Sequence, residues 1–435
     1  MAYTAETFFN MSDQVKLFNE FITPGVIAEI RARSKLFDKI QKDWKHIDTE
    51  GLYAKQKMLM AGSQSTGASN DGKYPEAQQS SADYSTIKIK RAQMFSLGFD
   101  GMALEAARGK GVSMKPMDFE KKGLFITMAD DLSRQLMLDG SGYLCQVPAV
   151  TADPTTEVTN SYFADATKFL KADRRLEVHT VGDAIGAGKV AASYSGALYV
   201  ASVTDKDTFE LSANNSVTAD HDDYYFNYKA YAETEAAGVG EMMGLMGIAS
   251  EDNPPQPNDV LGLQGLPVAS NAEWKGHVLD NPLGTGGTDR DLTEDLFVQA
   301  LQAVEDFAPV DVILVSPGVY REWLILLSSY KTLPNVKVMW GGWSGLPFYY
   351  DGREIPVVMD KFVPDGCALF ISNENLVLHV LTPGLLTWEE GFGASGGMLQ
   401  KVANYNRYKA EGHIFANLGT GLRKAFALVS DISEP

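Results

Sequence analysis

The chain has 435 residues, 45% of them hydrophobic and 22% charged, a composition typical of folded globular proteins and not of disordered tails. Its formal net charge of −18 argues against a protein whose affinity for nucleic acid rests on its own bulk electrostatics. Its cysteines, Cys145 and Cys367, are too few for a disulfide framework. No stretch has the roughly 18 consecutive apolar residues of a membrane span. We therefore expect a soluble, non-exported protein.

Residues 1–51 predict an N-terminal arm of two helices. The second helix begins at Thr23-Pro24, an N-cap followed by a first-turn proline. An apolar stripe runs along both helices from Val15 to Phe37. No nearby segment of the sequence covers this stripe, so a neighbouring subunit is a candidate for its cover.

Residues 52–99 predict one long hairpin with an unusually long tip. Its return limb carries apolar residues at alternating positions, the period of a half-buried strand: Ile87, Ile89, Phe95, Leu97 and Phe99. The tip, 61–83, is rich in Gly, Ser, Asn, Asp and Gln. Loops longer than about 12–15 residues are uncommon in compact domains. We therefore expect the tip to reach for a partner or to stay mobile.

The stretch 117–147 predicts a long amphipathic helix. Its apolar stripe consists of Phe125, Met128, Leu132 and Leu136. Polar residues occupy the opposite face: Asp130, Asp131, Arg134 and Gln135. The two glycines of Asp139-Gly140-Ser141-Gly142 end the helix, because they tolerate backbone angles that no helix uses. An apolar segment follows at once.

The end of this helix resembles the end of the spine helix in major capsid proteins of tailed phages, which share the Hong Kong 97 capsid fold. The residues that carry the resemblance are Arg134-Gln135-Leu136-Met137-Leu138-Asp139-Gly140-Ser141-Gly142-Tyr143-Leu144. Three further stretches are similar in the same order: the turn-rich hairpin, Glu241 to Ile248, and Tyr405 to Ile432. The resemblance spans nearly the whole chain. It implies that the hairpin is the extended loop that lies over an adjacent subunit.

Residues 149–231 predict a separate β module. Its strand candidates are Arg175 to Val181, Gly196 to Val203, and Thr208 to Leu211. Their spacing favours a small barrel or sandwich, and the resemblance identifies it with an insertion domain. Between residues 151 and 270 there are 18 Asp and Glu against 7 Lys and Arg, which indicates a solvated, outward-facing module.

Residues 232–382 predict an α+β or mixed α/β domain that corresponds to the axial domain of the capsid fold. Asp291 to Glu294 start one helix with a sequence like a capping box. Val310 to Val315 form an apolar, doubly covered strand. Ser316-Pro317 open a second helix, with Tyr320, Trp323, Leu324 and Leu327 expected to point inward.

The expected fold class is therefore α+β, of the Hong Kong 97 type, with a small all-β insertion domain. The expected divisions are an arm (1–51), an extended hairpin loop (52–99), a peripheral domain with the spine helix (100–148), the insertion domain (149–231), an axial domain (232–382) and returning C-terminal strands (383–435). The resemblance implies a structural subunit that assembles into hexamers and pentamers of an icosahedral phage head.

That function implies several partners and a location. The partners are other copies of the chain, scaffolding and portal proteins, a decoration protein, and packaged double-stranded DNA bound without sequence specificity. No membrane is expected. The location is the virion capsid, assembled in the host cytoplasm.

The sharpest catalytic candidate is Ser395, in Gly393-Ala394-Ser395-Gly396-Gly397, which has the spacing of a nucleophile elbow. That motif requires a strand before it, a helix after it, and an acid and a histidine downstream. The acid nearest His413 is Glu411, two residues away, which does not fit a triad layout. A Gly-rich loop is the favoured interpretation. A serine hydrolase and a β-rich binding or adhesion protein remain the alternative functions.

Other motifs favour ordinary structural roles. Gly284-Thr285-Gly286-Gly287 lacks the lysine of a phosphate-binding loop, and Asp220-His221-Asp222-Asp223 lacks the glycine and closing glutamate of a calcium loop. The histidines show no metal-ligand spacing: His46, His179, His221, His277, His379 and His413. Lys88 to Arg91 suit either an anionic partner or an exposed strand face. No catalytic, cofactor-binding or metal-binding residue is predicted, and no cofactor is expected.

Overall fold

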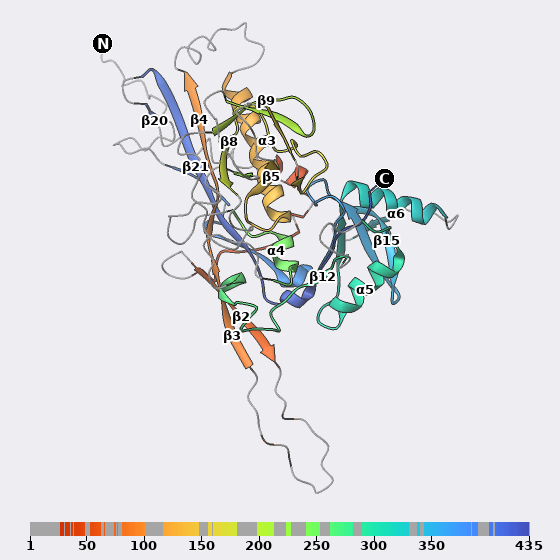
Figure 1. The fold of residues 1–435 in the computed structure, drawn as a ribbon. Coiled ribbons are helices and arrows are strands. Elements are labelled where there is room, and N and C mark those ends of the chain that lie inside the picture. Colours follow the sequence, from red (N-terminus) through yellow and green to blue (C-terminus); the bar gives the residue numbers. More distant parts are fainter. Residues whose placement is uncertain are drawn as a thin grey trace, which may run out of the picture.

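A computed structural model gives the fold (Figure 1). Apart from single positions within them, the described ranges are 27–47, 53–61, 81–100, 116–147, 155–180, 198–212, 223–227, 241–252, 262–281, 289–329, 337–339, 343–389, 400–402 and 405–434, with isolated residues between 65 and 76. These residues form three larger sheets, one two-stranded hairpin and several helices. None of the described helices is both long enough and apolar enough to cross a membrane.

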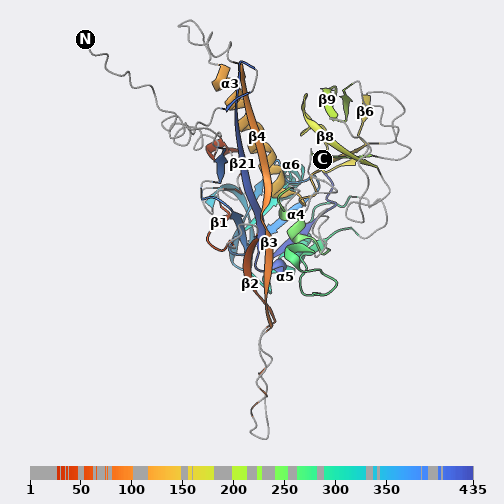
Figure 2. The same ribbon diagram turned by 90° about the vertical axis from the view of Figure 1, so that its left-hand side faces the viewer.

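The first sheet is built around one long strand near the C-terminus. Its strands are β1 (Gln41–Asp43), β18 (Leu376–Val380), β21 (Arg407–Thr420) and β19 (Leu386–Trp388), in that order, with β4 (Lys90–Asp100) and β20 (Gln400–Lys401) also paired to β21. β4 runs antiparallel to β21, from Asp100 opposite Arg407 to Lys90 opposite Ala416. Figures 1 and 2 show this pair as the long axis of the body. Segments more than 300 residues apart in sequence are thereby joined.

The hairpin is shorter than the sequence predicts. It consists of β2 (Tyr53–Ala61) and β3 (Ser81–Lys88), which pair along their length; Ala54 at the buried base also bridges Ile47, and the far ends project from the body (Figures 1 and 2). The expected return limb is two strands, because the chain passes from β3 through the buried Ile89 into β4. The prediction of a single hairpin over 52–99 is therefore wrong beyond Lys88. The alternation of apolar and polar residues does mark strands, but its second half is β4, which pairs with β21 and not with β2.

The predicted long helix is α3 (Pro116–Met137), which packs against β4. Met128, Leu132 and Leu136 are buried, as the apolar stripe requires. The polar face is also covered, since Arg134 and Gln135 are 0% and 1% exposed. After the helix, Gly140 and Gly142 adopt φ angles of 79° and 76°, the left-handed region that favours glycine.

The second sheet follows the spine helix directly. Its order is β6 (Thr155–Glu157), β10 (Thr208–Leu211), β9 (Leu198–Val203), β8 (Arg175–Thr180), β11 (Asp223–Asn227), β5 (Tyr143–Val147) and β7 (Asn160–Ser161). The three strand candidates predicted here correspond to β8, β9 and β10. β5 precedes the expected boundary at residue 149, so this sheet is continuous with the end of α3. The strand content agrees with the prediction of a β module, and its status as a separate domain stays a prediction.

The third sheet forms a lobe with two helices, which we call the axial lobe, and residues such as Leu314 and Phe426 on the sheet join it to the main hydrophobic core. Its order is β12 (His277–Leu279), β22 (Phe426–Val429), β17 (Ala368–Ile371), β13 (Val312–Val315), β16 (Arg353–Met359), β15 (Trp343–Tyr350) and β14 (Lys337–Met339). The helices are α5 (Glu294–Glu305) and α6 (Pro317–Ser329). Thr293 caps α5, its hydroxyl accepting from the Leu296 N–H at 3.4 Å. This lobe corresponds in order to the expected axial domain.

The axial lobe has its own aromatic core. The Phe297 ring lies 5.5 Å from the rings of Trp323 and Phe370 and 5.7 Å from that of Phe348, measured between centroids. Leu324, which was expected to point inward, is 36% exposed, so that expectation is wrong. The Trp323 position is confirmed, at 2% exposed.

The first sheet and the axial lobe are joined where β21 leads into β22, at residues 421–425. Arg423 is fully buried there and donates hydrogen bonds to four main-chain carbonyl oxygens: those of Gly247, Ile248, Asp252 and Trp274. Gly247 and Ile248 belong to the short helix α4 (Leu245–Ala249), whose last carbonyls have no partner within the helix. Burial lowers the pKa of Arg423 to about 10, against an opposing effect of Asp252, so the group stays charged at neutral pH.

The N-terminal arm is partly covered by its own chain. Leu36, Phe37 and Ile40 are at most 3% exposed and belong to the main hydrophobic core. The prediction of an uncovered stripe is therefore wrong at its Phe37 end, because the body of the same subunit packs against it. Residues 1–26, which hold the Val15 end of the stripe, lie outside the described residues.

Gly244, just before α4, lies tightly against the end of the spine helix. A Cβ atom at this position would overlap the carbonyl oxygens of Gln135 and Leu138. By contrast, a Cβ atom at Gly123, inside α3, would meet nothing within 4 Å. Only a residue without a side chain lets the segment before α4 approach the helix this closely.

We expect Gly244→Ala to lower the free energy of unfolding by about 1–3 kcal/mol, because backbone atoms must shift to admit the methyl group. Gly123→Ala is the matched control. It should raise that free energy by about 0.5–1 kcal/mol, since alanine loses less entropy than glycine in a helix. Urea unfolding of both variants measures the difference, and equal effects at the two positions would contradict this packing.

Candidate functional site

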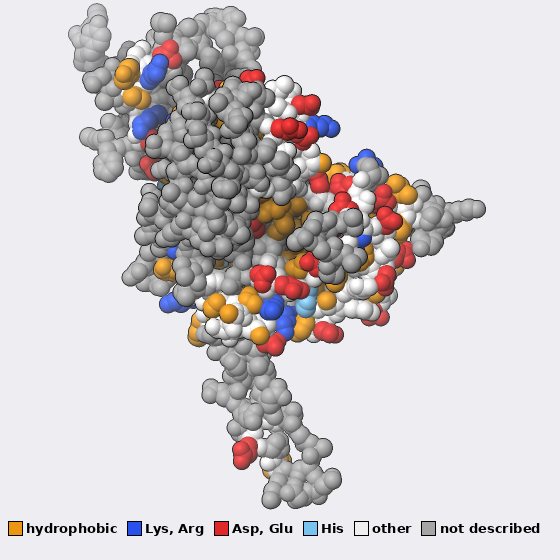
Figure 3. Space-filling model, in the orientation of Figure 1, with side chains coloured by type: hydrophobic (Ala, Val, Ile, Leu, Met, Phe, Trp, Pro, Cys, Tyr) orange, Lys and Arg blue, Asp and Glu red, His pale blue; other side chains and the backbone are white. Residues whose placement is uncertain are grey.

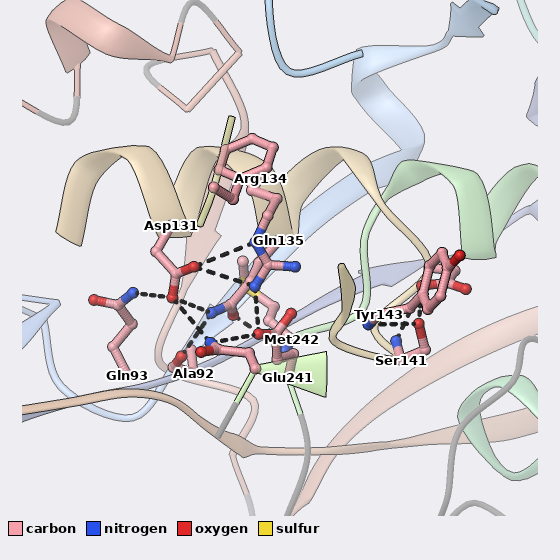
Figure 4. Close-up of polar contacts among 12 residues, drawn as sticks. Ala92, Gln93, Asp131, Arg134, Gln135, Ser141, Tyr143, Glu241 and Met242 are labelled. Atoms are coloured by element: carbon pink, nitrogen blue, oxygen red, sulfur yellow. Dashed lines mark hydrogen bonds and ion pairs between the residues drawn. The ribbon is translucent and has the colours of Figure 1, made fainter. Parts of the chain in front are cut away.

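The most concentrated group of polar side chains lies on the buried face of the spine helix (Figure 4). At its centre is Arg134, whose guanidinium donates to Asp131 Oδ1 from Nη2 at 3.1 Å and also to Glu241 Oε1. Arg174, on the segment before β8, donates to the same Asp131 oxygen at 3.0 Å. We call Asp131, Arg134, Arg174 and Glu241 the charge cluster. It joins α3, the second sheet and the segment before α4.

Asp131 and Arg134 stay charged because each is close to groups of opposite charge. Burial alone would raise the pKa of Asp131, but the guanidinium groups of Arg134 and Arg174 outweigh it and lower that pKa to about 2. Burial also works against the charge of Arg134, yet Glu241 and Asp131 raise its pKa above the usual value. A buried charge deprived of such partners is costly, so each member depends on the others.

Amide side chains extend the charge cluster to the neighbouring backbone (Figure 4). Gln135 donates from Nε2 to the Ala92 carbonyl oxygen in β4 at 3.0 Å, and its Oε1 accepts from the Met242 N–H at 3.3 Å. Gln93 donates to Asp131 Oδ2 at 2.8 Å. One helix face thus holds both the long strand β4 and the segment before α4.

A second set of bonds fixes the turn after the spine helix. Asp139 Oδ1 accepts from the Ser141 N–H at 3.0 Å and from its hydroxyl at 2.7 Å. Ser141 Oγ in turn accepts from the Tyr143 N–H at 3.2 Å, which starts β5. The Tyr162 hydroxyl donates to the other Asp139 oxygen at 3.1 Å. In the segment that carries the resemblance, Asp139 and Ser141 therefore fix the turn that connects helix and sheet.

Asn417, in the long strand β21, continues the same set of contacts. Its Oδ1 accepts from the Met243 N–H at 2.9 Å, and its Nδ2 donates to the Lys88 carbonyl oxygen at 2.8 Å. Lys88 ends β3, so the base of the projecting hairpin is tied to β21 and to the segment before α4. These bonds fix β3, β21 and the segment before α4 relative to one another. The Ser141 hydroxyl, which bonds to Asp139, is buried at 0% exposed.

The motif candidates from the sequence are only partly placed. Ser395 with its glycines, the Gly284 to Gly287 loop and Asp220 to Asp222 lie outside the described residues. His413 is described, and its Nδ1 lies 3.5 Å from a Glu389 oxygen. The basic run at Lys88 is not an exposed face, because Lys90 is 4% exposed.

His46 and His379 both lie near Asp43 of β1, although they are far apart in the sequence. Asp43 lies 2.6 Å from His46 Nδ1 and 3.8 Å from His379 Nδ1, measured from Oδ2. In the register of β1 and β18, Asp43 stands opposite His379. No group of three His, Cys, Asp or Glu side chains in the described ranges could hold a metal ion.

Sequence reasoning placed Asp131 and Arg134 on a polar face but did not identify them as a buried cluster. Their partners Arg174 and Glu241 are 43 and 107 residues away from the residues they bind. The signal available in the sequence was the density of polar side chains. Two acids, an arginine and a glutamine lie within six residues of a helix that packs on both sides. The cluster is a structural centre, and neither a catalytic nor a cofactor site was predicted here.

Comparison with solved structures identifies the fold class of this architecture. The chain resembles the capsid protein of Cyanophage A-1(L) with a TM-score of 0.51 and 12% identity, over 100% of this chain and 96% of that one. A chain in the structure of Mycobacterium phage Bobi gives a TM-score of 0.41 and 10% identity, over 92% and 90% of the two chains. By sequence, the chain matches no protein-family model and no curated protein. The first comparison shows a mixed α+β fold of the Hong Kong 97 capsid type, as the resemblance implied.

We expect Arg134→Met to lower the free energy of unfolding by about 3–5 kcal/mol, because it leaves Asp131 and Glu241 buried without their cation. Arg33→Met is the control, since Arg33 binds Asp130 at 2.7 Å but its side chain is 25% exposed. Its cost should be below about 1 kcal/mol. Chemical denaturation of the two variants gives both values, and a mild effect at Arg134 would show that the cluster is not needed for stability.

The pairing of β1 with β18 should weaken in mild acid. Burial lowers the pKa of His379 below its usual value of 6.5, with His46 acting in the same direction and Asp43 opposing them. A proton therefore binds His379 more readily when β1 is detached, so the stabilising effect is present above that usual pKa and is lost as the pH falls below it. Amide exchange of 41–43, corrected for intrinsic rates, should accelerate between pH 7 and 5.

His379→Leu provides the control for this pH dependence. The leucine fills the buried position without a titrating group, so exchange at β1 should no longer respond to pH in that window. An equally strong response in the leucine variant would assign the effect to another group.

Proposed function

We propose that the chain is a major capsid protein of a tailed phage, which assembles into the hexamers and pentamers of an icosahedral head around double-stranded DNA. The observation that carries the proposal is the fold match to the Cyanophage A-1(L) capsid chain, because it covers 100% of this chain and 96% of that one. A match of this extent leaves little of either chain for an unrelated activity. A fold alone does not establish a function, so the proposal also depends on features of this molecule that suit a shell subunit.

The projecting hairpin agrees with a role in assembly. β2 and β3 extend beyond the body and pair only with each other among the described strands (Figure 2). Tyr74, one of the few described residues of the tip, is 96% exposed. An isolated two-stranded ribbon is marginally stable in water, and an aromatic side chain this exposed gains from a partner surface. A neighbouring subunit would supply that surface in a closed shell.

The internal contacts also fit a shell subunit. The charge cluster and Asn417 tie the hairpin base, the long strands and the spine helix into one unit. A shell subunit makes many modest contacts that symmetry repeats. These contacts add up only when every subunit has the same geometry, so internal rigidity suits this role. We assign the arm to 1–51, the extended loop to 52–88, the peripheral domain to 89–148, the insertion domain to 149–231, the axial domain to 232–382 and the returning strands to 383–435.

The proposal includes the partners that a phage head requires. These are further copies of the chain, scaffolding and portal proteins, a decoration protein on the outside, and packaged DNA on the inside. With 56 Asp and Glu against 38 Lys and Arg, contact with DNA would be non-specific and local. The location is the virion, after assembly in the host cytoplasm.

The expressed chain should form rings, tubes or closed shells in negative-stain images. A variant with Ser63 to Gln79 replaced by Asn-Gly should melt nearly like the parent when unassembled, because each halving of a loop changes closure free energy by only about 0.6 kcal/mol. The same variant should lose shells or assemble weakly, since the missing contact recurs at every interface. Ser395→Ala is the control, and it should assemble as the parent does.

The alternative functions give different outcomes in this experiment. A serine hydrolase would remain monomeric at high concentration and lose its activity in Ser395→Ala. An assembly-competent tip variant would remove the hairpin from the elements that form the shell. A parent chain that stays monomeric, with or without scaffold, would overturn the proposed function.

A further inference from the structure

A groove of about 630 Å³ lies at the base of the projecting hairpin. β1 and the loop after it form one wall, and residues of β2 and β3 form the other. Val377 and His379 of β18 also line it. The groove is thus built from segments that the chain brings together across more than 330 residues, next to the element that leaves the body.

The groove contains buried polar atoms without partners. His379 is 2% exposed, and neither of its ring nitrogens has a hydrogen-bond partner in the described part of the chain. The same holds for Gln56 Oε1. A neutral imidazole offers one donor and one acceptor, and the amide oxygen offers a second acceptor. These atoms have almost no accessible surface, so both side chains belong to the floor of the groove and its rim carries the contact.

The walls and rim add aromatic and positive character. Trp44 and Tyr84 are 45% and 63% exposed, although both are large and partly apolar. Aromatic side chains of this kind are enriched where protein surfaces meet. Three lysines line the groove against one aspartate: Lys42, Lys45 and Lys55 against Asp43. The local charge is therefore opposite to that of the whole chain, which is −18.

The charge of the chain identifies the occupant. Asp and Glu side chains are spread over the axial lobe on the face shown in Figure 3, and acids outnumber bases by 56 to 38 overall. A neighbour that lies along the projecting hairpin also passes the base from which the hairpin emerges. In a contact where different patches of identical subunits meet, a basic groove on one copy faces an acidic surface on the next, which closes rings or shells.

We propose that this groove is a contact site between subunits, and that it receives an acidic, hydrogen-bonding segment of a second copy of the chain. The inference rests on the proposed function, because it requires that copies pack side by side. Trp44 and Tyr84 would contact the apolar atoms of that segment, and the lysines would face its carboxylates.

Photo-cross-linking tests the occupant directly. Tyr84 is replaced by p-benzoylphenylalanine, and both assembled particles and dilute unassembled protein are irradiated. We expect a covalent product of two copies from particles only, with the cross-link mapped by mass spectrometry to a segment that contains Asp or Glu. Attachment to nucleic acid, attachment only within one chain, or particles without any cross-link would overturn the proposal.

A charge reversal tests the electrostatic part. Lys45→Glu should raise the concentration needed for assembly by about tenfold, because it places like charges against each other, while the melting of unassembled protein stays unchanged. Lys206→Glu is the matched control: Lys206 is exposed in the turn between β9 and β10, remote from the groove in sequence and in sheet, and should assemble as the parent does. Equal effects of the two reversals would overturn the charge assignment.

The two proposals fail in different ways. If the parent chain forms no particles, the proposed function fails and takes this contact with it. If the parent forms particles that show neither the cross-link nor the Lys45 effect, the proposed function stands and the groove is not a subunit contact.

Discussion

The ion pairs of Arg134 with Asp131 and Glu241 are the interaction on which the rest of the structure depends. A cation with no exposed surface requires both carboxylates, and these come from the spine helix and from a segment 107 residues later. The second arginine, Arg174, brings in the sheet that follows the helix. Because an unpaired buried charge is costly, these segments cannot separate one at a time. The cluster therefore adds to a hydrophobic core that the same elements share, which includes Leu132, Leu144 and Met242, and makes them one cooperative unit.

Local patterns in the sequence predicted much of the fold. The spine helix, the cap at Thr293 and the strand Val312–Val315 all follow from signals within a few residues, and all are present. The misses depend on long-range pairing. The limb after Lys88 has strand periodicity whichever partner it takes, and only β21, more than 300 residues later, decides that it leaves the hairpin. Periodicity fixes the face of a strand but not its neighbour.

The buried polar centre and the groove escaped sequence reasoning for the same reason. Asp131, Arg134 and Gln135 read as the solvated side of an amphipathic helix, because nothing nearby indicates a second covering layer. His379 and Asp43 meet only through the parallel pairing of β1 with β18. The apolar arm was correctly read as needing a cover, yet Phe37 finds it within the same chain. Composition shows that a surface must be covered, and topology decides by what.

Arg423 shows how a joint can constrain shape without constraining its surroundings. Its guanidinium binds four main-chain carbonyl oxygens, and such oxygens are present whatever side chains the residues carry. The side chains around this joint can therefore change while the angle between the first sheet and the axial lobe is kept. In the proposed shell, copies of related chains that differ in those side chains would still share that angle. Recognition of the backbone by one charged side chain lets neighbouring residues vary without altering how the two parts meet.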